Sequence, residues 1–131
     1  MLHHQERSES LTLTTESPAR ARSMLTTLAA DWHLELEVTQ RAELLVSEIV
    51  ADAVDHGSDA ATLRISIDGD KLELELFDGP RRSAIATSGR DEGVPGMRMR
   101  MLAQVADGRY SSDLGEGHYA RYEIRSGDGA A

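Results

Sequence analysis

The longest regular pattern in the chain is a stretch in which apolar residues recur at helical spacing. When successive residues are placed about 100° apart, the apolar positions between 42 and 53 fall on one arc, as on the core face of an amphipathic helix. They are Ala42, Leu45, Val46, Ile49, Val50 and Ala53. The pattern ends at His56-Gly57, where glycine can adopt the left-handed conformation that terminates helices. We therefore predict a long helix around which the other elements are organised.

Shorter patterns on either side predict a strand, a helix and a β-hairpin. Residues 11–15 alternate and are rich in β-branched side chains, which is typical of a short edge strand. Ser17-Pro18 favours a helix start, with serine as the cap and proline at the first helical position. Residues 61–67 and 71–77 alternate between apolar and polar, and the turn residues Asp68-Gly69-Asp70 separate them. These two runs predict a hairpin with one apolar face.

The second half of the chain begins with an aperiodic segment. Residues 78–95 are rich in Gly, Pro, Ser and Arg, and loops of this length are usually lids, binding loops or disordered segments. A helix is predicted for residues 96–106. Two further strands are predicted near 108–112 and 117–125, with turn residues at 113–116 between them.

This order of elements predicts an α+β fold in a single domain. We expect a two-layer sandwich in which about three helices cover one face of a mostly antiparallel, mixed sheet. The domain is predicted to span residues 11–125, which is within the usual size of one domain. Residues 1–10 are expected to be a flexible N-terminus, and residues 126–131 a disordered tail.

Composition narrows the class of protein. The chain has no cysteine, no apolar run of membrane length and no signal-peptide core near its start, so we expect a cytoplasmic protein without a membrane partner. Its formal charge of -9 argues against direct binding of nucleic acid, which requires clustered Lys and Arg. The arginines are concentrated locally, so the chain can accept a compact polyanion or present its acidic side to a basic protein.

Candidate chemistry begins with a row of carboxylates on the long predicted helix. Glu48, Asp52 and Asp55 are spaced at four and three residues, so they share one side of the helix, and Leu44 lies beyond them. One interpretation is a second solvated edge of a surface helix. The other is a general base together with a metal ligand.

The row of carboxylates, together with His56-Gly57 after it, resembles the first motif of the GHKL (Bergerat-fold) ATP-binding family. Within that family it is most similar to the motif of the small anti-sigma-factor serine kinases. In that motif a glutamate is followed four residues later by an asparagine, and then by a histidine and a small residue. Glu48 matches the glutamate, Asp52 stands at the asparagine position, and His56-Gly57 matches the ending. The resemblance implies that Glu48 is the catalytic base, that Asp52 binds Mg2+, and that His56 belongs to the nucleotide site. Aspartate can also ligate Mg2+ through oxygen.

The second motif of the family is similar to Phe77-Asp78-Gly79-Pro80. The resemblance implies that Asp78 recognises the adenine amino group and that Gly79 permits close approach of the base. Gly79 follows Asp78 directly, whereas the family has one residue between them. Taken alone, the same residues are a favourable turn.

The third motif is a glycine-rich entry to a helix, which is similar to residues 93–98. The resemblance implies a phosphate cradle made by Gly93, Gly96, Met97 and Arg98 at the helix N-terminus. Val94 and Pro95 differ from the family pattern, and Pro95 cannot donate an amide. A capped helix start is the other interpretation.

A fourth position completes the set of nucleotide contacts. Gly117-His118-Tyr119 stands where the family has a glycine and then a threonine that contacts the nucleotide. The resemblance implies that Tyr119 occupies the position of that contact, although it is bulkier than threonine.

The resemblance covers residues 11–125 and implies a histidine-kinase-like ATPase fold. It also implies a serine/threonine kinase that uses ATP and Mg2+ and acts by partner switching on a sigma factor, an anti-sigma-factor antagonist protein, or both. The departures at Asp52, Val94, Pro95 and Tyr119 leave a second hypothesis open, a non-catalytic module that sequesters a regulatory protein without nucleotide. Monomer and homodimer both remain open.

Overall fold

The computed structural model describes residues 4–80, 104–113 and 117–126. Within these ranges, five strands form one sheet with the order β1-β2-β3-β5-β4, and every neighbouring pair is antiparallel. The elements are β1 (His4–Thr12), α1 (Ser17–Asp31), α2 (Leu36–Asp55), β2 (Ala60–Asp68), β3 (Lys71–Asp78), β4 (Gly108–Asp113) and β5 (His118–Arg125).

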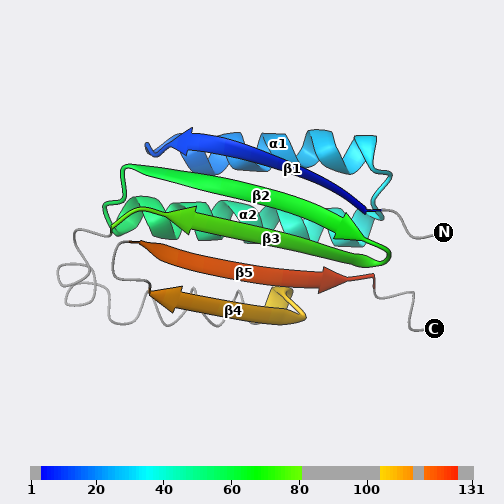
Figure 1. The fold of residues 1–131 in the computed structure, drawn as a ribbon. Helices are drawn as coiled ribbons and strands as arrows, with labels where there is room; N and C mark the ends of the chain where they lie inside the picture. Colours follow the sequence, from blue (N-terminus) through cyan, green and yellow to red (C-terminus); the bar gives the residue numbers. More distant parts are fainter. Residues whose placement is uncertain (1–3, 81–103, 114–116, 127–131) are drawn as a thin grey trace.

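Both described helices lie on the same face of the sheet, with α1 toward the β1 edge and α2 behind β2 and β3 (Figure 1). The opposite face carries no helix among the described residues. The prediction of an α+β two-layer arrangement is thereby confirmed. The prediction of a mostly antiparallel, mixed sheet was wrong in one respect for the described strands, because all their pairings are antiparallel. The predicted helix at 96–106 lies mostly outside the described residues, and only Gln104 and Val105 are described there as helical.

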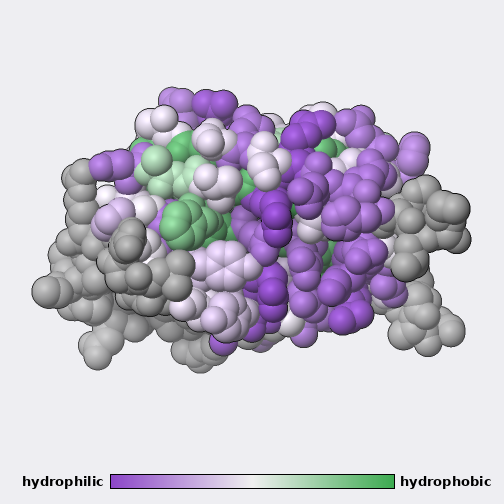
Figure 2. Space-filling view, viewed as in Figure 1, coloured by the Kyte–Doolittle hydropathy of each residue, from purple (hydrophilic) through white to green (hydrophobic). Residues whose placement is uncertain are grey.

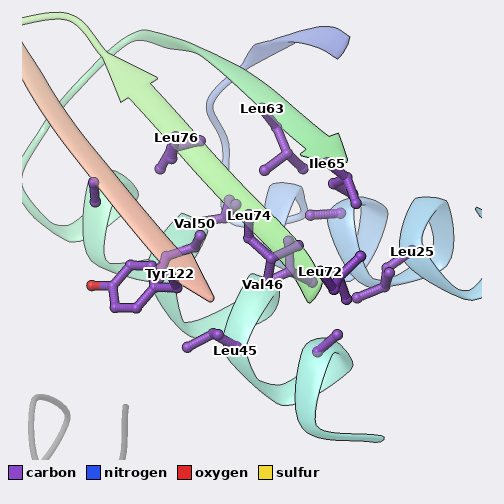
Figure 3. Packing of buried hydrophobic residues seen from close by; sticks show 14 of the residues in the cluster. Leu25, Leu45, Val46, Val50, Leu63, Ile65, Leu72, Leu74, Leu76 and Tyr122 are labelled. Carbon is purple, nitrogen blue, oxygen red and sulfur yellow. The ribbon is translucent and has the colours of Figure 1, made fainter. Parts of the chain in front are cut away.

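The core forms where the inward side chains of the sheet meet the apolar arc of α2 (Figure 3). Alternate residues of the central strands point toward the helices, as the period of two requires. The largest buried side chains include Leu63, Ile65, Leu72, Leu74, Leu76, Ile124, Leu25, Leu45, Val46 and Val50. Burial of each such side chain contributes about 1.5–3 kcal/mol. This layer packs α2 against β3 and β5.

The first strand begins earlier than predicted. Residues 4–12 pair with β2 in a continuous antiparallel register that runs from His4 and Asp68 to Thr12 and Ala60. The prediction that residues up to 10 form a flexible N-terminus was therefore wrong for residues 4–10. Ser17 is the first residue of α1 and not its cap. Its Oγ accepts a hydrogen bond from the Thr14 amide (2.8 Å) and donates one to the carbonyl of Thr12 (3.1 Å).

Other turn predictions are confirmed. Gly57 follows α2 with a φ of 83°, and Gly69 stands in the hairpin turn with a φ of 66°, so both use the left-handed region. Ser126 is described, and its amide and hydroxyl donate to the Asp70 carbonyl and to Glu35 Oε1. The rest of the predicted tail lies outside the described residues. No helix in the described part of the chain combines the length and apolar character needed to cross a membrane.

Candidate functional site

The row of carboxylates on α2 is unevenly exposed to solvent. Glu48 and Asp52 are half-buried, whereas Asp55 is exposed. His56, one turn beyond Asp52, lies with Nδ1 2.9 Å from the Asp52 carbonyl oxygen and 3.5 Å from its Oδ1. The structure therefore places His56 beside Asp52 at the end of α2, and Asp55 differs from Glu48 and Asp52 in its greater exposure.

Asp78 is the last residue of β3 and is completely buried. Strand alternation turns it toward the helix layer, in phase with Leu72, Leu74 and Leu76. Ser58, just beyond the end of α2, donates a 2.6 Å hydrogen bond to Asp78 Oδ2. The C-terminal end of α2 and the end of β3 are thus joined by a buried polar contact.

His118, the first residue of β5, lies on the other side of the same carboxylate. It is the register partner of Asp78, and its Nδ1 lies 3.5 Å from Asp78 Oδ1. His118 Nδ1 is buried but has no hydrogen-bond partner. Among the described residues, no other buried side-chain nitrogen or oxygen lacks one. Buried polar atoms are normally hydrogen-bonded, so such an atom marks a position where a ligand group or water can bind.

A buried carboxylate is costly unless hydrogen bonds replace its hydration. The Ser58 hydroxyl meets this need at Oδ2 and also lies 3.3 Å from the carbonyl of Gly79. The other oxygen faces the nitrogen of His118 at a distance too long for a strong hydrogen bond. Asp78 therefore has one oxygen held by a short hydrogen bond from Ser58, and the imidazole of His118 beside the other.

Gly117 is required by close packing at this site. A Cβ atom built on Gly117 would lie 2.7 Å from the carbonyl oxygen of Asp78 and 3.2 Å from the ring of Phe77. The entry to β5 can approach the end of β3 only because Gly117 has no side chain. Gly79, by contrast, has open space around the position of a Cβ.

The structure does not bring Tyr119 to this site. Tyr119 is paired with the exposed Phe77 on the open face of the sheet, and its hydroxyl donates to Glu75 Oε2 at 2.5 Å. Partial burial and the Glu75 carboxylate raise the pKa of Tyr119. Burial raises the pKa of Glu75, but hydrogen bonds from Tyr119 and Arg64 outweigh it, so the pKa of Glu75 is lowered. This face is largely hydrophilic, with one hydrophobic area (Figure 2).

The predicted phosphate cradle cannot be placed, since Gly93, Gly96, Met97 and Arg98 lie outside the described residues. Within the described ranges, no group of three or more His, Cys, Asp or Glu side chains is arranged to hold a metal ion. A metal ion at Asp52 would therefore have at most two such side chains from the described part of the chain as ligands.

Two residues of the site were missed by the sequence interpretation. Strand alternation in residues 118–125 places His118 on the same side as Ala120, Tyr122 and Ile124, so the period of two already favoured His118 over Tyr119. Ser58 carries no comparable local signal, because its partner is twenty residues away in the sequence.

Comparisons with known proteins add no family to this description. No protein-family model matches the chain, and no curated protein matches it.

Proposed function

We propose that this chain is an ATP-binding regulatory protein that resembles the anti-sigma-factor serine kinases and acts by partner switching. The observation that carries the proposal is the buried carboxylate of Asp78, held by Ser58 beside the helix that bears Glu48, Asp52 and His56. A completely buried carboxylate at the end of a strand, joined through Ser58 to the end of a helix that bears the half-buried acids Glu48 and Asp52, is typical of a binding site.

The chemistry of the site suits adenine. The Ser58 hydroxyl holds Asp78 Oδ2, and the carboxylate, which can accept several hydrogen bonds, would accept one from an exocyclic amino group. Guanine presents a carbonyl oxygen at the corresponding position, and two acceptors facing each other repel. The site therefore favours adenine over guanine nucleotides.

The carboxylates of α2 fit the phosphate end of such a ligand through magnesium. Asp52 would supply an oxygen ligand to Mg2+, and Glu48, one turn earlier, would accept the proton of a serine hydroxyl on a partner protein. A bound Mg-ATP would supply the phosphoryl group for transfer. On this proposal the partners are a sigma factor, an anti-sigma-factor antagonist, or both.

One observation favours a second function, a non-catalytic module that sequesters a regulatory protein without nucleotide. Asp52 Oδ1 lies 3.5 Å from His56 Nδ1, so the proposed metal ligand already has a neighbour of its own. An aspartate without a firmly bound metal also places a negative charge near a triphosphate, which opposes binding.

The decisive experiment compares thermal unfolding with saturating Mg-ATP and with Mg-GTP. A ligand that binds only the folded state raises the melting temperature. We expect a rise with Mg-ATP and little or none with Mg-GTP. Asp78→Asn should lose the rise with Mg-ATP, while Asp68→Asn, an exposed acid at the far end of β2, should keep it.

Asp52→Asn separates the two functions. If Mg-ATP stabilises Asp52→Asn but not the parent, nucleotide binding has been lost at one position and the sequestering function is favoured. If Mg-ATP changes neither melting temperature, the ATP-binding proposal is wrong.

A further inference from the structure

A cavity of about 430 Å³ lies at the end of the sheet opposite Asp78. It is enclosed by the turn between α1 and α2, the start of β1 and the β2-β3 hairpin. Its floor is apolar and consists of buried or half-buried side chains, namely Trp32, Leu34, Val38, Ile67 and Leu72. This volume is within the range of small-molecule sites, which are mostly apolar with a few polar groups.

The rim of the cavity is acidic. Asp31, Glu35 and Asp70 are exposed at its edge, and no Lys or Arg is present among the described residues that line it. No ion pair joins any of the three to a described residue, and Glu35 Oε1 accepts only the neutral hydroxyl of Ser126. The mouth therefore combines three carboxylates and the exposed imidazole of His33 with an apolar interior.

The end of α1 adds to the negative potential at the mouth. Asp31 is the last residue of α1, where the helix dipole is negative and a carboxylate is unfavourable, and the last turn holds no basic residue. The positive N-terminal end of α2 is offset by Glu35 and by Glu37 in its first turn. A cation at the mouth would relieve this accumulation of charge.

We propose that this cavity binds a small organic ammonium ion that carries an unbranched apolar tail. The tail occupies the floor formed by the aliphatic side chains and Trp32, and the ammonium group lies among the carboxylates of the rim. The indole of Trp32 adds a cation–π attraction to an ammonium placed near its face. The assignment is independent of the nucleotide proposal, because it uses other residues at the other end of the molecule.

Trp32 supplies a direct readout, since it is the only tryptophan in the chain. We would titrate the protein at neutral pH with hexylamine, hexanol and hexanoate, which share a tail and differ in charge, and follow tryptophan fluorescence. Hexylamine is expected to shift the emission and to bind at least about fivefold more tightly than hexanol, with hexanoate weakest. Butylamine should bind roughly tenfold more weakly than hexylamine, because each buried methylene contributes about 0.8 kcal/mol.

Matched variants test the role of the rim. Asp31→Asn combined with Asp70→Asn should weaken hexylamine about tenfold and leave hexanol unchanged. Glu16→Gln is the control, since it removes an exposed acid at the other end of α1, roughly 22 Å away. The proposal is overturned if hexanol binds as tightly as hexylamine, if the double variant keeps the parent affinity, or if no amine changes the fluorescence. A lysine-containing peptide that binds when free amines do not would also overturn it, in favour of a protein partner.

Discussion

The hydroxyl of Ser58 donates a 2.6 Å hydrogen bond to the carboxylate of Asp78, and both residues are buried. Ser58 is the third residue after α2, and Asp78 ends β3, so this bond fixes the carboxylate relative to the end of the helix that carries Asp52. One polar contact thus stabilises a buried acid and aligns two segments of the candidate site.

Removal of the Ser58 hydroxyl should be costly. Ser58→Ala removes the 2.6 Å hydrogen bond to the buried Asp78 carboxylate, and we expect the free energy of unfolding to fall by about 1–3 kcal/mol in urea denaturation. Ser58→Thr keeps a hydroxyl and should lose less. Equal stability of Ser58→Ala and the parent would show that another group satisfies Asp78.

Two glycines beside the site should respond in opposite ways to alanine. Gly117→Ala would press a methyl group against the Asp78 carbonyl, and we expect a loss of about 1–3 kcal/mol. Gly79→Ala meets open space and should be neutral or slightly stabilising, because alanine restricts the unfolded chain. Urea denaturation of both variants measures the difference. Similar losses for the two would contradict the packing described at Gly117.

Elements in which buried and exposed side chains alternate regularly could be predicted from the sequence. Elements without such a pattern could not. The β2-β3 hairpin alternates because one of its faces is buried, whereas residues 4–10 of β1 are almost all polar and form a strand through backbone pairing with β2. Asp78 was found through a motif, but Ser58 was not, because the bond between them joins distant parts of the chain. His118 and Tyr119 face opposite sides of β5, and the motif position selected Tyr119, whose side chain lies on the open face of the sheet.

Arg41 is expected to stabilise the packing of α2 against the segment that leads into β4. Its Nε and Nη2 donate to the Val105 carbonyl at 2.9 and 2.7 Å, and Nη2 also reaches Asp107 Oδ2 at 3.0 Å. Arg41→Lys keeps the charge but loses this fork, so we expect a loss of about 1–2 kcal/mol in chemical denaturation. Arg22→Lys, on the exposed surface of α1, should change stability little. A small effect of Arg41→Lys would show that charge alone is sufficient.

Asp107 should make stability depend on acid pH. Its pKa is lowered, first by the hydrogen bond from the Arg125 amide and also by Arg41, against a smaller opposing effect of burial. A group with a lowered pKa stabilises the fold above its ordinary value of 3.8, and the contribution is lost as the pH falls through the folded-state pKa.

The stability gap between the parent and Asp107→Asn should therefore be largest at neutral pH and shrink below about pH 4. Denaturation series across this range measure it, with Asp68→Asn as the control. A gap that is independent of pH would contradict the assignment.

His33 occupies a backbone position that usually belongs to glycine. Its φ is 56°, and it ends α1 while the Leu34 amide donates to the Ala29 carbonyl at 2.9 Å. His33→Gly should raise the free energy of unfolding by about 0.5–1 kcal/mol, whereas His33→Ala should lower it. Thermal and urea denaturation both test this. A destabilised glycine variant would indicate that the imidazole makes a contribution of its own.

The continuity of α2 has a consequence for how distant ligands can influence each other. The helix runs unbroken over 20 residues, or roughly 30 Å, and places Val38 in the floor of the cavity and His56 just beyond its other end. Molecules bound at the two ends cannot touch, so any cooperativity between them must be transmitted through the protein, and a tilt or shift of α2 would reach both sites. Thermodynamic linkage then requires the effect to be reciprocal, with an amine changing nucleotide affinity by the same factor as the nucleotide changes amine affinity.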